Sequence, residues 1–272
     1  MSGDRSRWLV HPGEAPCIDE RDPADTSGAP GDEDKTRRTY ERLADDLFKL
    51  QDRLYAESAQ SLLVVLQAVD AGGKDGTIKH VFRGINPQGV HVTTFKAPNA
   101  DELAHDFLWR VHKTTPGRGL IGIFNRSHYE DVLAVRVHDL VPEPVWRARY
   151  DHINNFEALI SGDSRTRVVK IFLHISREEQ AERLRERLER PDKRWKFKLG
   201  DLDERKRWDD YIEAYEEAIA RTSTEHAPWY VVPADHKWFR NWAVSRIVIE
   251  TLEEMDPRYP EPAEDLDGVI VT

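Results

Sequence analysis

The hydrophobic pattern of the chain alternates between helical and strand-like periods. Apolar residues recur at steps of three and four between Tyr40 and Leu54, which places them on one face of an amphipathic helix. Residues 61–69 (SLLVVLQAV) form instead a largely apolar, β-branched run, as in a strand buried on both faces. Further strands are predicted over 90–95, 119–124, 167–176 and 229–234, and helices over 99–112, 177–190, 203–222 and 236–254.

The order of these elements predicts an α/β fold. Strands that alternate with helices of this length imply right-handed βαβ crossovers and a parallel sheet covered by helices on both faces. We therefore expect a five-stranded parallel sheet in one domain over residues 36–255. Residues 1–35 and 256–272 carry few apolar residues, and we expect an irregular extension and a tail there. Ligands of such sheets bind beyond the carboxyl ends of the strands.

Composition narrows the class of protein. The chain has 272 residues and a formal net charge of -10, which argues against a general nucleic-acid or membrane binder, because such proteins usually carry a basic surface. Its single cysteine, Cys17, excludes an internal disulfide framework, and no apolar run approaches the roughly 18 residues of a membrane-spanning helix. The first residues also lack the apolar stretch of a secretory signal. A cytoplasmic location is expected.

The strongest chemical signal lies in residues 66–82 (LQAVDAGGKDGTIKHVF), where an apolar strand leads through glycines and a lysine into a helical pattern. Gly72 and Gly73 let several backbone N–H groups point inward, and Lys74 supplies a charge for phosphate oxygens. The loop thus resembles the phosphate-binding motif G-x-x-x-x-G-K-[ST]. The alternative is a plain strand-to-helix turn with a solvated lysine.

The match to that motif is imperfect at the position that usually binds a metal. Ala68 replaces the first glycine, Asp75 stands at the Ser/Thr position, and Thr77 comes two residues late. Asp70 therefore becomes the candidate metal ligand, directly or through water. The candidate phosphate- and nucleotide-binding residues are Gly72, Gly73, Asp75, Gly76, Thr77, Lys79 and Asn125.

A second strand-end motif occupies residues 119–132 (GLIGIFNRSHYEDV). Arg126 follows the strand, and its planar guanidinium can clamp a phosphate with paired hydrogen bonds. Asn125 stands where many nucleotide kinases have an acidic residue, so Glu130 and Asp131 are considered as helpers for the metal. The alternative is that Arg126 is a helix-end ion-pair partner and that Asn125 is a helix cap.

Residues 178–208 predict a basic lid. Pro191 should end the preceding helix, and residues 190–198 carry five basic side chains and one acidic one. Such a turn resembles the mobile lids that close over phosphates. A solvated helix with Glu/Arg pairs explains 178–190 well, but explains 193–198 less well. Trp195 and Phe197 are expected to anchor the lid by packing. The basic residues predicted to contact phosphates are Arg183, Arg187, Lys193, Arg194, Lys196 and Lys198.

Four collinear blocks make the sequence similar to the polyphosphate kinase 2 family over roughly residues 36–255: VDAGGKDGTIKHV, GINPQGVHVTTFKAP, HDFLWRVHKTTPGRGLIGIFNRSHYEDVL and RPDKRWKFKLGDLDERKRWDDYIEAYEEAI. The resemblance implies a P-loop kinase fold related to thymidylate kinase. It also implies Mg²⁺-dependent, reversible phosphoryl transfer between inorganic polyphosphate and nucleotides, with Mn²⁺ as another usable ion.

The family's catalytic residues map onto Asp70, Lys74 and Arg126, and its lid residues map onto the stretch from Arg183 to Lys198. Asn125 departs from members that carry Asp there, which leaves Asp70 as the implied metal ligand. The form FNRSHYEDVL resembles the branch that accepts nucleoside mono- and diphosphates. The implied partners are polyphosphate, these nucleotides and ATP, and we expect a homo-oligomer that binds neither nucleic acid nor a membrane.

Two other functions stay open at this point. An ATP-dependent nucleotide kinase would share the fold and most of the chemistry. A non-catalytic polyanion-binding protein would explain the departures at Ala68, Asp75 and Asn125. Because a phosphate acceptor is already ionised at neutral pH, no general base is required in the first two cases, and alignment and charge neutralisation should carry the reaction.

Overall fold

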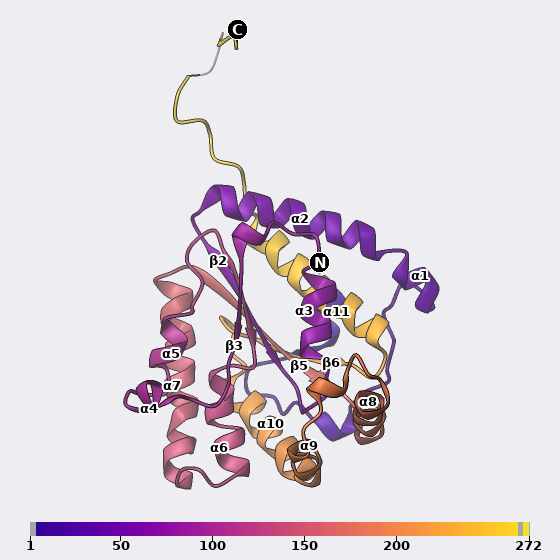
Figure 1. The fold of residues 1–272 in the computed structure, drawn as a ribbon. Helices are drawn as coiled ribbons and strands as arrows, with labels where there is room; N and C mark the ends of the chain where they lie inside the picture. The colour runs from indigo at the N-terminus through magenta and orange to yellow at the C-terminus, as the bar shows by residue number, and fades with distance from the viewer. Residues whose placement is uncertain (1–3, 266–268, 272) are drawn as a thin grey trace.

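A six-stranded sheet forms the centre of the molecule (Figure 1). The computed structural model describes residues 4–265 and 269–271. The strands follow the spatial order β1-β6-β5-β2-β4-β3, and every neighbouring pair is parallel except β1 with β6. The strands are β1 (Leu9–Val10), β2 (Ser61–Gln67), β3 (Val90–Thr94), β4 (Ile121–Asn125), β5 (Thr166–His174) and β6 (Trp229–Pro233). The α/β class and the five predicted parallel strands are confirmed.

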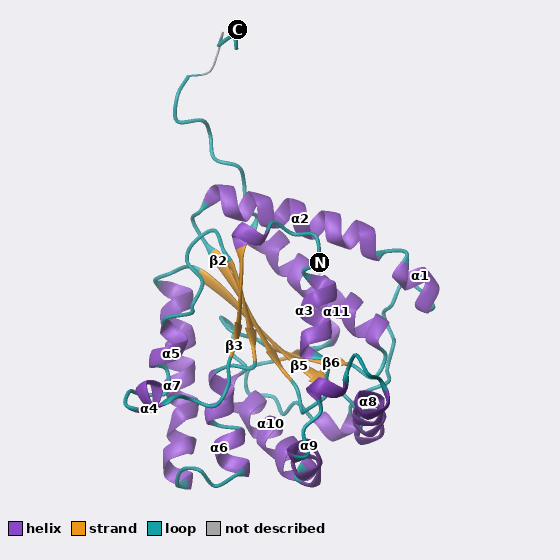
Figure 2. Cartoon of the chain, in the orientation of Figure 1, coloured by secondary structure: helices purple, strands orange, loops and turns teal. Residues whose placement is uncertain are grey.

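Helices cover both faces of this sheet (Figure 2). Helices α2, α3 and α11 lie together on one face, and α6, α7 and α10 lie on the other. The described helices are α1 (Glu33–Arg37), α2 (Tyr40–Glu57), α3 (Lys74–Val81), α4 (Ala100–Leu103), α5 (Trp109–His112), α6 (Ala134–Val137), α7 (Glu143–Gly162), α8 (Arg177–Glu189), α9 (Gly200–Lys206), α10 (Trp208–Thr222) and α11 (Lys237–Met255). None of them has the length and apolar composition needed to cross a membrane.

The N-terminal segment supplies the sixth strand, so the prediction of an irregular extension was wrong for part of it. β1 pairs antiparallel with β6 at the edge of the sheet. Beside it, the buried Trp8 ring makes edge contacts with Phe239 and Trp242 of α11, at centroid distances of 6.0 and 5.8 Å. Two strand residues and one tryptophan give too short a pattern to identify from sequence periodicity.

Three helical segments differ from the sequence prediction. The predicted helix 99–112 is two short helices, α4 and α5, and the predicted helix 203–222 is divided at Arg207 into α9 and α10. Helix α7 was missed, although its buried residues recur at helical spacing: Trp146, Tyr150, Ile153, Phe156 and Ile160. Pro142 precedes this helix and fixes the backbone where it begins.

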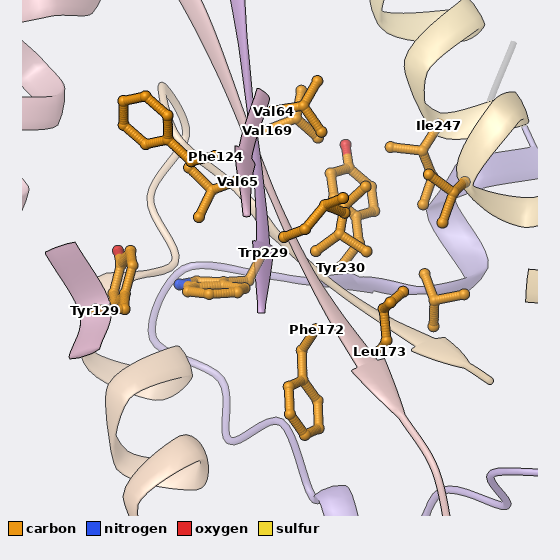
Figure 3. Packing of buried hydrophobic residues seen from close by; sticks show 14 of the residues in the cluster. Val64, Val65, Phe124, Tyr129, Val169, Phe172, Leu173, Trp229, Tyr230 and Ile247 are labelled. Carbon is orange, nitrogen blue, oxygen red and sulfur yellow. The ribbon is translucent and has the colours of Figure 1, made fainter. Parts of the chain in front are cut away.

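The hydrophobic core is continuous across both faces of the sheet (Figure 3). The central strands β2 and β5 are buried along nearly their whole length, as the apolar run at 61–69 predicted. Helix α2 buries Leu43, Leu47 and Leu54, and it packs against α11. Leu66 of β2 pairs with Asn125 of β4. The segments that follow these two strands therefore leave the sheet at the same edge.

Candidate active site

The loop between β2 and α3 is a tight glycine turn. Gly73 has φ 101°, a left-handed conformation that side chains rarely adopt, and its carbonyl accepts the Thr77 N–H at 3.0 Å. A Cβ added to Gly72 would stand 2.3 Å from the Ala68 Cβ, so only glycine fits there. The Thr77 hydroxyl donates back to the Gly73 carbonyl at 3.2 Å. Thr77 therefore stabilises the loop, and its hydroxyl faces the backbone.

Arg126 joins the two strand ends. Its Nη2 donates to Asp70 Oδ1 at 2.6 Å, and its Nη1 donates to Glu130 Oε2 at 3.2 Å. Its own backbone is left-handed, with φ 62°, and its N–H bonds to the Leu66 carbonyl at 3.2 Å. A non-glycine residue in this conformation is uncommon, and such strain clusters at functional sites. The charge of Glu130 raises the pKa of Arg126, so the guanidinium stays charged.

Lys74 begins α3 and points into the loop. It is only 9% exposed, and its Nζ donates to the Ala68 carbonyl at 2.8 Å. Burial and the positive charge of Arg126 lower the pKa of Lys74 to about 8, against the opposing effect of Asp70. The loop thus contains a desolvated ammonium group whose free energy improves when an anion arrives.

Asp75, Asn125 and Lys196 form a bridge between the loop, β4 and the lid. Asn125 Nδ2 donates to Asp75 Oδ1 at 2.8 Å, and Lys196 Nζ lies 3.3 Å from Asp75 Oδ2. Burial opposes ionisation, but these two hydrogen bonds lower the pKa of Asp75. The basic turn that contains Lys196 therefore contacts the loop between β2 and α3 directly.

The other predicted lid cations are distributed differently. Pro191 does end α8, which stops at Glu189, and the basic turn contains a short 3₁₀ helix at Arg194–Lys196. Arg187 pairs with Asp201 of α9 at 3.3 Å, and Lys193 pairs with Glu186 at 2.6 Å. The Glu/Arg pairs that the alternative predicted for 178–190 are Arg183 with Glu179 at 2.6 Å and Arg190 with Glu186 at 3.1 Å. The side chains of Arg194 and Lys198, like that of Lys79 on α3, have no hydrogen-bond or ion-pair partner among the described residues.

Two predictions about the lid need correction. Trp195 does not anchor it by packing, because the side chain is 77% exposed and only its Nε1 bonds, to the Asp192 carbonyl at 3.0 Å. Arg183 is buried behind the loop, where Nη1 donates to the Ala71 carbonyl at 3.1 Å and Nη2 to the Ala234 carbonyl at 2.6 Å. Arg183 therefore holds the backbone of the loop, and its donors are already occupied.

Sequence reasoning missed Gln180, which links the loop to the lid. Its Nε2 donates to the Asp70 carbonyl at 2.9 Å, and its Oε1 accepts from Arg205 of α9 at 2.8 Å. Its place on α8, one turn before Arg183 and directly after a buried strand, is the signal that could have drawn attention to it.

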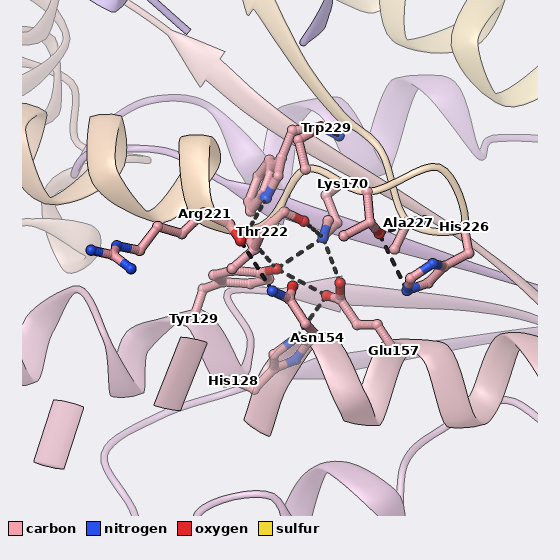
Figure 4. A network of polar contacts seen from close by, with 12 residues as sticks. His128, Tyr129, Asn154, Glu157, Lys170, Arg221, Thr222, His226, Ala227 and Trp229 are labelled. Atoms are coloured by element: carbon pink, nitrogen blue, oxygen red, sulfur yellow. Dashed lines mark hydrogen bonds and ion pairs between the residues drawn. The ribbon is translucent and has the colours of Figure 1, made fainter. Parts of the chain in front are cut away.

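A buried polar network supports the segment that follows Arg126 (Figure 4). Lys170 of β5 bonds Glu157 of α7, the Tyr129 hydroxyl at 3.0 Å and the Thr222 carbonyl at 2.7 Å. His128 Nε2 lies 3.2 Å from Glu157 Oε1. Burial favours a neutral carboxyl, but Lys170 holds the pKa of Glu157 below its usual range. The network fixes the 3₁₀ turn His128–Asp131 from beneath.

The acidic groups near Arg126 make a small donor set for a metal. Within the described residues, no group of three or more His, Cys, Asp or Glu side chains could hold a metal ion. Asp70 and Glu130 place two carboxylates on either side of Arg126. Mg²⁺ usually binds through one or two carboxylates together with substrate phosphates and water. The residues therefore fit a cation that arrives with a phosphate ligand.

Comparisons with a family model, with known sequences and with solved structures all point to the same protein family. The model of the polyphosphate kinase 2 (PPK2) family matches residues 31–260. The chain is 54% identical over 250 residues to an AMP/ADP-polyphosphate phosphotransferase of Meiothermus ruber, covering 92% of this chain and 93% of that protein. It is 48% identical over 237 residues to an ADP-polyphosphate phosphotransferase of Rhodopseudomonas palustris, covering 83% and 80%. A crystal structure of a polyphosphate kinase 2 from Arthrobacter aurescens TC1 superposes with a TM-score of 0.93 at 40% identity, covering 97% and 94%.

Proposed function

The chain belongs to the polyphosphate kinase 2 family, and from this premise we propose that it transfers phosphoryl groups between inorganic polyphosphate and nucleotides. The observation that carries the proposal is the convergence of Asp70, Lys74 and Arg126 at one sheet edge, with a lid lysine in contact with the same loop. We propose AMP and ADP as the acceptors, because the similar Meiothermus ruber protein is named for both nucleotides.

Each side chain has a distinct part in this reaction. The loop amides near Gly73 and the Lys74 ammonium bind phosphate oxygens, and Arg126 stabilises the charge that spreads over the transferred group. Lys196, Arg194 and Lys198 of the lid hold the anionic donor chain. Closing the lid also excludes water, which would otherwise hydrolyse the donor. No general base is needed, since the acceptor phosphate is already ionised.

Asp70 is the proposed ligand of Mg²⁺, with Glu130 nearby. Held by Asp70 and the substrate phosphates, such a cation would supply charge neutralisation to the phosphate oxygens. The ion pair of Asp70 with Arg126 keeps this carboxylate in place at the end of β2. Activity lost on chelation of divalent ions and restored by Mg²⁺ tests the assignment. Full turnover in the presence of excess chelator would refute it.

The function is tested with purified protein, long-chain polyphosphate, Mg²⁺ and either ADP or AMP. We expect ATP from ADP, measured by luciferase luminescence, and ADP from AMP, measured by nucleotide chromatography. A Lys74→Met variant is the matched control and should form neither product. Transfer from ATP but not from polyphosphate would identify an ordinary nucleotide kinase. Binding of polyphosphate without turnover would identify a non-catalytic protein.

A further inference from the structure

Arg240 is a buried cation directly behind the phosphate loop that the mechanism above does not use. It stands in the first turn of α11 and is 2% exposed. A Cβ added to Gly73 would lie 2.2 Å from Arg240 Nη1, and one added to Gly76 would lie 3.4 Å from Nη2. The guanidinium therefore touches the backbone of the loop and of the first turn of α3.

No carboxylate of the described residues pairs with this guanidinium. Among the described residues, its Nε and Nη2 bond the amide oxygen of the adjacent Asn241 at 3.2 and 2.8 Å, and it forms no ion pair. The neighbouring Arg183 is also buried, but it has an ion pair with Glu179 at 2.6 Å. Burial and the positive charge of Arg183 lower the pKa of Arg240 to about 10. A buried charge without a partner destabilises a folded protein.

The position of this charge indicates what compensates it. Arg240 lies behind the loop residues whose amides are proposed to face the substrate. Its positive charge therefore acts on a bound phosphate through the protein interior, which screens charge weakly. A bound phosphate chain brings several negative charges to the opposite side of Gly73. We propose that Arg240 is an electrostatic support for phosphate binding, which acts through the loop without touching the substrate and is compensated only when the polyanion is bound.

The inference rests on the proposed function, so the test measures stability as well as turnover. Arg240→Met removes the charge and keeps an unbranched, flexible side chain that is shorter than arginine, and Arg240→Lys keeps the charge. Arg42→Met changes an exposed arginine of α2, which lies 3.8 Å from Asp46 on the surface. For each protein we would measure the thermal midpoint with and without long-chain polyphosphate, and the kcat and KM for polyphosphate.

For Arg240→Met we expect a ligand-free midpoint equal to or above that of the wild type and a smaller polyphosphate-induced rise. Its KM for polyphosphate should increase about tenfold or more, with kcat changed much less. Arg240→Lys and Arg42→Met should stay close to the wild type in the thermal midpoint, in its rise with polyphosphate and in KM.

Three results would overturn the role of Arg240: a wild-type KM and midpoint shift in Arg240→Met, a ligand-free Arg240→Met protein that is less stable or unfolded, or equal losses in Arg240→Lys. Absence of any polyphosphate effect on the wild type would instead overturn the proposed function. The two failures are therefore distinguishable.

Discussion

Replacing Lys74 by methionine should stabilise the ligand-free protein while it abolishes transfer. The protein lowers the pKa of this ammonium from 10.5 to about 8, chiefly by burial. At about 1.4 kcal/mol per pKa unit, the folded state disfavours the charge by about 3 kcal/mol. Methionine removes that cost and loses the hydrogen bond to the Ala68 carbonyl, worth about 1 kcal/mol. The net gain is about 2 kcal/mol.

The gain is measurable as a melting temperature. Unfolding entropy is about 2.1 cal/mol/K per residue, so about 2 kcal/mol raises the Tm of a chain of 272 residues by about 3 to 4 °C. Calorimetry and the luciferase assay then give the two readouts on the same preparations. Lys49→Met, on an exposed position of α2, is the control and should change neither. A Lys74→Met protein that melts lower, or that retains more than a tenth of the wild-type kcat/KM, would refute the reasoning.

The same shift predicts a pH dependence with a defined sign. The folded-state pKa of Lys74 is below its unfolded value, so between about pH 8 and 10.5 the unfolded chain binds more protons. The free energy of unfolding of the wild type should therefore gain a favourable contribution as the pH rises through this window. The advantage of Lys74→Met should be full below pH 8 and should shrink above it. A pH-independent difference between the two proteins would contradict the assigned cause.

Three further substitutions test the site. Asp70→Asn should lower kcat by about a hundredfold or more and raise the Mg²⁺ concentration needed for half-maximal rate, with a retained circular-dichroism spectrum; an unchanged Mg²⁺ requirement would exclude it as metal ligand. Lys196→Ala should raise the KM for long polyphosphate more than the KM for the nucleotide. Its Tm should stay constant, because the ion pair of Lys196 with Asp75 is exposed. The reverse KM pattern would place this lysine at the nucleotide. Glu157→Gln breaks a fully buried ion pair with Lys170 and should cost about 3 to 5 kcal/mol in urea unfolding, and a loss below about 1 kcal/mol would show that the pair is not ionised.

The parts of the site that the sequence predicted are those set by local pattern and strand pairing. An apolar run followed by glycines and Lys74 identifies a strand, a loop and a helix, and a second strand delivers Arg126 to the same edge. Parallel pairing of the two strands then brings Asp70 and Arg126 together, which the 2.6 Å contact confirms.

The contacts of the lid cations were harder to predict, because the composition of a segment does not determine which acidic group each cation pairs with. Arg187 and Lys193 are held by Asp201 and Glu186, partners that lie 14 and 7 residues away in the chain. Lys196 instead reaches Asp75 across 121 residues. A count of basic side chains between 190 and 198 cannot distinguish these two situations.

Contacts between distant segments account for the individual core and site residues that were missed. Trp8 contacts α11 from the other end of the chain, and Gln180 binds a carbonyl 110 residues away. Arg240 does have a local signal, since it interrupts the otherwise largely apolar run WFRNWAV at the start of α11. The apolar residues around it on the helix predict that this charged residue is buried. The groups that it contacts depend on the tertiary fold.

The exposed indole of Trp195 gives the lid its own optical signal. The chain contains eight tryptophans, and the other seven are buried or half-buried in the body of the molecule. Emission at long wavelength from a water-exposed ring at the tip of the basic turn should therefore shift when that turn changes its surroundings. Stopped-flow fluorescence of the unlabelled enzyme can then separate the rate of lid movement from the rate of phosphoryl transfer.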